Sequence, residues 1–136
     1  MSYISSGGSL GITAAGTKAV VGGTKDGGGV AISTGKLAGY ITVPYGATIS
    51  AWSIAVDVGT CTIKVWKVAT GTAVPTAANA INTSGVAISS GTYVRSTTVT
   101  DFTSTTITAN DILAFNIEAV AGGCTQLTFT IEITRT

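Results

Sequence analysis

The last run of the chain places the strongest constraint on its fold. From Leu127 to Thr134, apolar and polar residues alternate without a break. This two-residue period predicts a β-strand with one buried face and one hydrated face, whereas a helix would scatter the same residues around its circumference. Leu127, Phe129, Ile131 and Ile133 form the apolar face, so these side chains are predicted to enter the core.

Short runs rich in β-branched residues fill most of the remaining chain, and Gly, Asn, Asp or Pro separates them. Besides the final strand, strands are predicted at 30–33, 36–43, 47–57, 61–68, 86–89, 92–99, 105–108 and 112–120. Many short strands without a helix of normal length are typical of an all-β protein. The prediction is a two-sheet antiparallel β-sandwich, jelly-roll-like, with a closed barrel as the alternative.

Two local features and one apolar cluster refine this prediction. In the run 47–57, Ile49 falls on the face opposite to the later apolar residues, so a β-bulge or a face switch is predicted near Ser50. A tight turn at Gly59 predicts that this run and 61–68 form an antiparallel hairpin. The predicted inter-sheet core contains Leu127, Phe129, Ile131, Ile133, Leu113, Phe115, Ile117, Ile63 and Val65.

The N-terminal residues 1–18 are rich in Ser, Gly and Ala and have no hydrophobic period. They are predicted to form an extended N-terminal arm, and 19–136 a single β-sandwich domain. A mobile tail is the alternative. The glycine-rich stretch 22–29 lacks the Lys and Ser/Thr of a phosphate-binding loop and is predicted to be a flexible turn. The candidate assembly contacts on a neighbouring subunit are Tyr3, Ile4, Leu10 and Ile12.

The chain is weakly charged for its size. Of its 136 residues, 45% are hydrophobic and 10% are charged, the formal net charge is +1, and the mean hydropathy is +0.51. A surface of Thr, Ser, Gly and Ala loses little when a neighbour covers it, so the chain is predicted to be an assembled subunit. The balanced charge predicts no nucleic-acid partner. The sequence also lacks a signal-peptide pattern and a membrane-spanning run, so we expect cytoplasmic synthesis and no membrane partner.

Residues that could carry catalysis are scarce. The chain has no histidine, and its six carboxylates are spread out, mostly at turns where Asp accepts backbone hydrogen bonds. A glycosidase needs two facing carboxylates, and Ser or Thr needs a base to become a nucleophile. We therefore expect no enzyme, no catalytic residue and no cofactor. Cys61 and Cys124 lack metal-ligand spacing, so no metal is predicted; reduced thiols are the first interpretation and a disulfide is the second.

Trp66 and Tyr93 are the candidate residues for surface recognition, because aromatic faces stack on sugars and anchor protein interfaces. Trp66 shares its face with Lys64 and so points away from the core, where packing under a loop or against another subunit is favoured over a glycan. The loop 69–85 is long enough to carry function, and an inter-sheet crossover with a helical turn is the alternative. The glycosylation triplet that starts at Asn82 carries no prediction.

Seven pieces of the chain together resemble a known family. They are DGGGVAISTG at 26–35, GYITVP at 39–44, ISAW at 49–52, IKVWK at 63–67, PT at 75–76, NDILAFN at 110–116 and LTFTIEIT at 127–134. In this order they are similar to small β-sandwich domains of tailed-bacteriophage virions, over about 24–136. The resemblance implies a place on the particle and often a trimer, and it supplies no catalytic residues. One position differs, because the family commonly carries an Asp where this chain has Lys64.

Two roles follow from the resemblance and the composition. The first is a non-enzymatic capsid decoration or cement protein, assembled in the host cytoplasm, which sits on the exterior of the virion. Its partners would be other virion proteins, namely major capsid or tail proteins, and the arm would thread onto them. The second is a tail-fibre or receptor-binding module that attaches to host cell-surface glycan. A homo-oligomer is expected in either role, with a trimer favoured.

Overall fold

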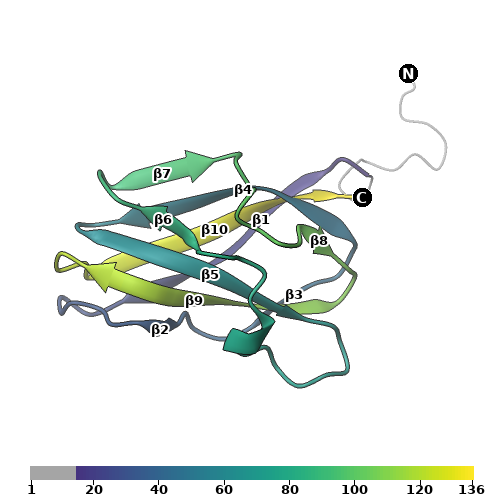
Figure 1. The fold of residues 1–136 in the computed structure, drawn as a ribbon, viewed down its shortest axis with the longest axis horizontal. Coiled ribbons are helices and arrows are strands. Elements are labelled where there is room, and N and C mark those ends of the chain that lie inside the picture. Colours follow the sequence, from purple (N-terminus) through teal and green to yellow (C-terminus); the bar gives the residue numbers. More distant parts are fainter. Residues whose placement is uncertain (1–14) are drawn as a thin grey trace.

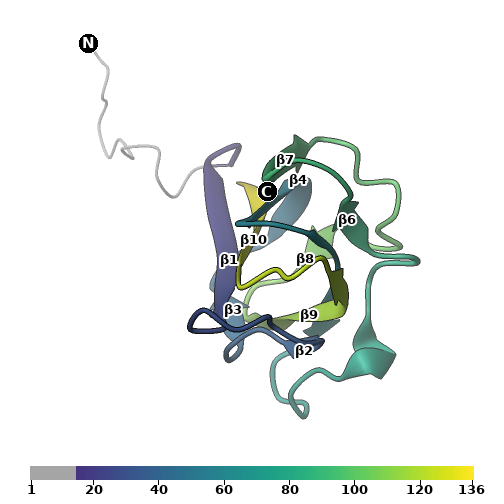
Figure 2. The ribbon, with the colours of Figure 1, turned by 90° about the vertical axis from the view of Figure 1, so that its left-hand side faces the viewer.

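Two antiparallel β-sheets stack face to face in the computed structural model (Figure 1, Figure 2), which describes residues 15–136. The predicted all-β, two-sheet sandwich is therefore confirmed over this range. The predicted contacts Tyr3, Ile4, Leu10 and Ile12 lie outside the described residues.

Sheet A is built around the alternating run that ends the sequence. Its strand order is β1-β10-β4-β7, and β8 also pairs with β4. The bounds are Lys18–Asp26 for β1, Ala47–Val56 for β4, Tyr93–Ser96 for β7, Thr106–Ile107 for β8 and Gln126–Arg135 for β10. Strand β10 has a long partner on each side, and its apolar residues are buried between the sheets.

Sheet B combines two long strands with short pieces. Its strand order is β2-β9-β5-β6, and β3 also pairs with β9. The bounds are Gly35–Lys36 for β2, Ile41–Val43 for β3, Thr60–Val68 for β5, Val86–Ile88 for β6 and Asp111–Ala121 for β9. A 3-10 helical turn, η1 (Ala77–Asn79), lies in the connection between β5 and β6.

The core lies between the sheets, and every predicted core residue is buried within it. The predicted set is Leu127, Phe129, Ile131, Ile133, Leu113, Phe115, Ile117, Ile63 and Val65. The rings of Phe115 from sheet B and Phe129 from sheet A meet edge to face, with centroids 5.2 Å apart and planes at 63°. Aromatic pairs prefer this arrangement, so the contact ties the two layers together.

Strand β1 corrects the interpretation of the first glycines. The strand begins at Lys18, the last residue of the predicted arm, and Gly22 and Gly23 lie inside it rather than in the predicted flexible turn. Glycine is required at the first of these positions because a Cβ on Gly22 would lie 2.1 Å from the backbone oxygen of Phe129. The turn is confined to the later glycines, of which Gly28 and Gly29 have positive φ.

Strand β4 confirms one local prediction and overturns another. The register shifts so that Ala51 and Ile49 face consecutive residues of β10, which leaves Ser50 as the extra residue of the predicted bulge. The predicted hairpin of β4 with β5 is wrong, because β4 belongs to sheet A and β5 to sheet B. The short turn at Gly59 crosses between the layers, so that β4 pairs with β10 and β5 pairs with β9.

Three further boundaries differ from the sequence predictions. The run 30–33 is irregular rather than a strand, although it buries Ile32, whose amide donates to the carbonyl of Cys124 at 2.9 Å. The run 36–43 divides into two short pieces, β2 and β3. The loop 69–85 contains the expected helical turn, but it connects two neighbouring strands of sheet B instead of crossing between sheets.

Candidate interaction surface

The outer face of sheet A is a broad surface of small polar side chains. Strand alternation turns Thr128, Thr130 and Glu132 of β10 away from the core, and each pairs with an outward residue of β1. On β4, Thr128 and Thr130 pair with the outward Ala55 and Ser53, whereas Glu132 pairs with the covered Ala51. Across Thr130, for example, the row runs from Gly22 to Ser53. The term "sheet A face" denotes Val20, Gly22, Thr24, Thr48, Ser50, Ser53, Ala55, Tyr93, Arg95, Thr128, Thr130, Glu132 and Thr134.

Hydroxyl groups on the sheet A face bind one another. The Ser53 and Thr130 hydroxyls share a hydrogen bond, Thr134 Oγ1 donates to Ser50 Oγ at 3.2 Å, and Ser50 Oγ donates to the carbonyl of Glu132 at 3.3 Å. A polar group that already has a partner loses less when water is removed. A neighbouring protein could therefore cover this face without stranding its polar atoms.

One ion pair also lies on the sheet A face. Arg95 of β7 donates through Nε and Nη2 to the carboxylate of Glu132 on β10, at 2.5 and 2.8 Å. These hydrogen bonds lower the pKa of Glu132 below its ordinary value and raise the pKa of Arg95. Because each charge has its partner on the same face, the pair leaves little net charge to repel or attract a neighbour.

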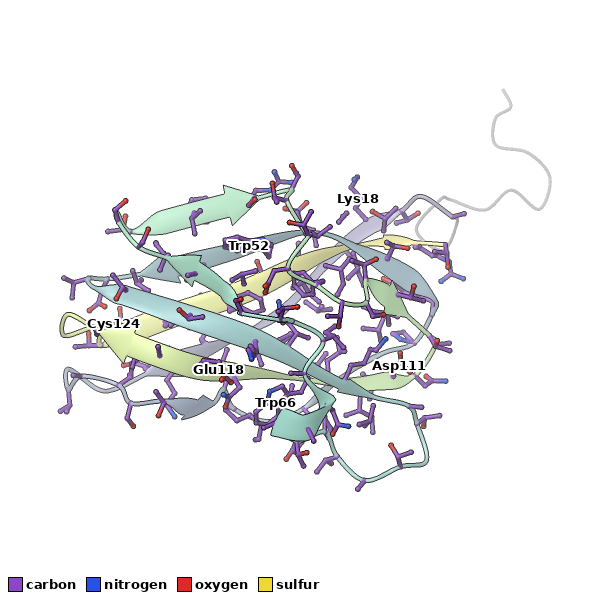
Figure 3. All side chains as sticks on the ribbon, viewed as in Figure 1. Lys18, Trp52, Trp66, Asp111, Glu118 and Cys124 are labelled. Atoms are coloured by element: carbon purple, nitrogen blue, oxygen red, sulfur yellow. The ribbon has the colours of Figure 1, made fainter. Side chains whose placement is uncertain are left out.

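The two recognition candidates lie on different layers and are not brought together. Tyr93 is 60% exposed on β7 and pairs with Ala55 on the sheet A face. Trp66 of β5 lies on the outer side of sheet B, beside η1 (Figure 3), and its backbone bridges to Ala80. Its indole Nε1 is buried without a hydrogen-bond partner among the described residues, so the loop covers much of this ring.

Two shallow hollows flank the first residue of β10. A hollow of about 270 Å³ lies on the β1 side, and Asp26 and Gln126 are among its lining residues. A second, of about 260 Å³, lies on the β4 side between Ala55, Asp57 and Gln126. Since Ala55 pairs with Tyr93, the second hollow lies next to an exposed aromatic ring.

The Asp57 carboxylate is fully engaged in holding the start of β10. It accepts from the Thr125 and Gln126 amides at 3.0 and 3.2 Å, from the Val58 amide at 2.9 Å, and from the Thr125 hydroxyl. Hydrogen bonds to a charged carboxylate favour that form, so these donors hold the pKa of Asp57 well below its usual range.

The remaining turn aspartates confirm the prediction that such residues accept backbone hydrogen bonds. Asp26 accepts from the Gly28 amide, Asp111 from the Thr108 amide, and Asp101 from two amides of the loop 69–85, each at 2.8 Å. Asn82, the first residue of the glycosylation triplet, is buried and bonded to Asp101, so a sugar could not reach it in this fold.

The two cysteines are free, buried and close to each other. The turns that precede them lie at one end of the sandwich, because a Cβ on Gly122 would lie 2.8 Å from the Cα of Gly59. Burial raises the pKa of Cys61 to about 11, and nearby Cys124 contributes to the increase. Burial also raises the pKa of Cys124, which lies near the Asp57 carboxylate. Raised pKa values leave few reactive thiolates at neutral pH.

Comparison with known proteins identifies no relative: no family model, no curated protein and no solved structure matches the chain. Within residues 15–136, no His, Cys, Asp and Glu side chains form a group of three or more that could hold a metal ion. Over the same residues, no helix has the length and apolar character needed to cross a membrane.

Sequence reasoning missed the sheet A face although its signal was visible. The polar half of the alternating run, Thr128, Thr130, Glu132 and Thr134, predicts the central row of this face. The sequence does not show which other strands extend this face, because both partners of β10 lie more than 70 residues before it. One of them, β1, is also interrupted by glycine.

Proposed function

We propose that this chain is a non-enzymatic structural subunit that packs against other proteins through the sheet A face. The observation that carries the proposal is the self-bonded character of that face, where hydroxyls pair with hydroxyls and Arg95 pairs with Glu132. Such a surface extends over four strands, and its paired polar groups lose little when water is removed. A neighbouring subunit could therefore cover it with little loss of hydrogen bonding.

The state of the carboxylates supports a role without catalysis. Asp26, Asp57, Asp101 and Asp111 each hold a turn through backbone amides, and Glu132 holds Arg95. A general acid must carry a proton to release, and hydrogen bonds from fixed donors lower the pKa of Asp57 and of Glu132 and so oppose their protonation. These hydrogen bonds favour a structural role for the carboxylates over a catalytic one.

We further propose that the assembly is a tailed-bacteriophage virion, with the chain as a decoration or cement protein on the capsid. This part rests on the resemblance of the ordered motifs, from DGGGVAISTG to LTFTIEIT, to small virion β-sandwiches. The neighbours would then be major capsid or tail proteins, and Tyr3, Ile4, Leu10 and Ile12 stay candidate anchors on them. The trimer stays a prediction of the resemblance.

Binding to stripped phage capsids tests the proposal. The variant Thr128→Arg places a long cation on an exposed position of the sheet A face, and Ala87→Arg places the same group on an exposed position of sheet B. We expect cosedimentation of wild type and Ala87→Arg with the capsids, and at least tenfold weaker binding of Thr128→Arg. Equal binding by both variants would reject the sheet A face, and failure of the wild type would reject the capsid role.

The candidate anchors can be tested separately in the same assay. A chain that begins at Ala15 keeps β1 and the bond from the Gly16 amide to the Arg135 carbonyl, which a cut after Lys18 would remove. We expect the shortened chain to fold and to lose affinity for capsids. Rebinding as tight as that of the full chain would remove Tyr3, Ile4, Leu10 and Ile12 from the attachment.

One observation favours a second function, the attachment to host glycan. Tyr93 lies beside the hollow lined by Asp57 and Gln126, and sugar sites combine an aromatic platform with polar groups that bind hydroxyls. Binding to a glycan array would test it, with Tyr93→Ala as the variant and Tyr40→Ala, another exposed tyrosine, as the control. Specific binding lost only in Tyr93→Ala would favour this function over the decoration role.

A further inference from the structure

The outer edge of β1 is the longest free strand edge of the described fold. The other margins consist of short pieces, such as the four-residue β7 and the three-residue β6, whereas β1 has nine residues. In Figure 2, β1 runs along the open left-hand side of the molecule, and within residues 15–136 its only strand partner is β10. A long unpaired edge is a template for pairing with another strand.

The hydrogen bonds of β1 with β10 show which groups point outward. The Gly27 amide donates to the Thr125 carbonyl, and the Arg135 amide donates to the Thr17 carbonyl. Backbone groups of an antiparallel strand point alternately to its two sides. The odd-numbered residues of β1 therefore face β10, and the free amides and carbonyls belong to Lys18, Val20, Gly22, Thr24 and Asp26.

Nothing in β1 blocks pairing at this edge. The register with β10 runs from Lys18 to Asp26 without a shift, and the strand has no proline. Val20 is 61% exposed. Among the outward residues of β1, the charged ones are Lys18 and Asp26, at the two ends of the strand. A bulge, a proline and a central charge, which protect edge strands, are thus absent from β1, and its inner-side Lys25 lies next to the end of the strand.

The outward residues of β1 are complementary to themselves. We infer that β1 pairs antiparallel with β1 of a second copy of this chain, around a two-fold axis at Gly22. Lys18 then faces Asp26 of the second copy, Val20 faces Thr24 of the second copy, and the two Gly22 residues face each other. Opposite charges thus meet at both ends of the paired strands, and the two A sheets become continuous.

The charged residues favour this register over registers shifted by two residues. A slip by two residues would place Lys18 opposite Thr24 of the second copy and leave Asp26 without its cation. Glu132, on the same face, is hydrogen-bonded by Arg95, and Lys18 acts on it only through space. Because a two-fold contact uses the same edge of both copies, it closes at a dimer, whereas the trimer expected from the resemblance would need another surface.

Zero-length carbodiimide cross-linking gives a test that is specific to this register. Within one chain, Lys18 and Asp26 stand at opposite ends of β1, about 27 Å apart at ~3.4 Å per residue, so they cannot be joined directly. We expect a Lys18–Asp26 cross-linked peptide in the covalent dimer, together with the mass of a dimer in sedimentation of the full chain. A monomer at all concentrations, a trimer, or a dimer without this peptide would overturn the inference.

Charge reversal provides a second test with an internal rescue. We expect Lys18→Glu and Asp26→Lys to weaken the dimer at least tenfold each, and the double variant to restore it. Lys64→Glu on sheet B is the matched control and should leave the dimer unchanged. Asp26 also accepts a hydrogen bond from the Gly28 amide, so circular dichroism must show that Asp26→Lys is folded. If Asp26→Lys does not fold, the result for Lys18→Glu alone decides the test. A dimer unaffected by Lys18→Glu would contradict the pairing.

Discussion

Sheet A and sheet B have the same number of strands but differ in how they meet their surroundings. In sheet A, β1, β10 and β4 pair along nearly their whole lengths, and their outer face carries Thr, Ser and Gly. In sheet B, β5 and β9 are flanked by β2, β3 and β6, each no more than three residues long. The loop 69–85 also folds beside Trp66 on the outer side of sheet B.

This difference indicates a division of labour between the layers. The loop 69–85 covers part of the outer side of sheet B, and short strands lie at its margins. Sheet A has an uncovered outer face and a free strand edge at β1. When only one sheet of a sandwich has a long free edge, strand pairing with other chains is limited to that edge.

Removing the ring that joins the layers should have the largest effect. Phe115→Ala is expected to lower the free energy of unfolding by about 3–5 kcal/mol, through lost transfer energy and a residual cavity. Urea unfolding measures this change. A double-mutant cycle with Phe129→Ala should yield a coupling of about 0.5–1.5 kcal/mol, because the rings touch edge to face. Additive effects would mean that the layers are held together elsewhere.

Loosening the loop that covers sheet B should have an intermediate effect. The buried Asn82 side chain accepts the Val65 amide at 2.7 Å, so Asn82→Ala leaves that donor without its partner. We expect a loss of about 1–3 kcal/mol in the free energy of unfolding. Thr83→Ala, which changes the adjacent exposed residue and keeps the glycosylation triplet, is the control and should unfold like wild type.

The Asp57 turn between the layers should make stability depend on pH. The lowered pKa of Asp57 means that its contribution is complete above the ordinary value of 3.8 and is lost as pH falls through the folded-state value. Asp57→Asn should therefore be less stable than wild type at neutral pH. The gap between the two unfolding midpoints should narrow below pH 3.8. A gap that stays constant in acid would show that the hydrogen bonds do not depend on the charge.

Breaking the ion pair on the sheet A face should have the smallest effect. Arg95 is exposed and Glu132 is partly exposed, so water and salt screen their attraction. We expect the unfolding midpoint of Arg95→Ala to lie close to that of wild type and to approach it further in high salt. Ser53→Ala on the same face serves as the comparison. A large loss in Arg95→Ala would mean that the face is held together by charge rather than by the backbone ladder.

The periodic part of the sequence predicted the fold class and the core. Alternation in β10 and in 112–120 identified the inward residues correctly, since a buried face and a hydrated face leave a two-residue signature in any strand. The extra residue at Ser50 was also predictable, because Ile49 breaks that signature. The candidate recognition residues were assigned to strands, but their assignment to opposite layers needed the structure.

The remaining errors have a shared physical cause in tertiary contacts. Gly22 and Gly23 were interpreted as a turn because glycine weakens isolated strands, yet the close approach of β10 leaves no space for a side chain at Gly22. Similarly, a short turn fits both a hairpin and a corner between sheets, so the tight connection at Gly59 did not reveal that β4 and β5 belong to different layers.

The buried thiols at the end of the sandwich provide a built-in reporter. Cys61 and Cys124 lie under the two turns that touch at Gly59 and Gly122, and Cys124 Sγ donates to the Gln126 carbonyl at 3.3 Å. An alkylating reagent can reach either sulfur only when this end opens, so the labelling rate measures the frequency of local opening under native conditions. The protein could thus be monitored inside an assembly, without an added dye, by the mass of its alkylated peptides.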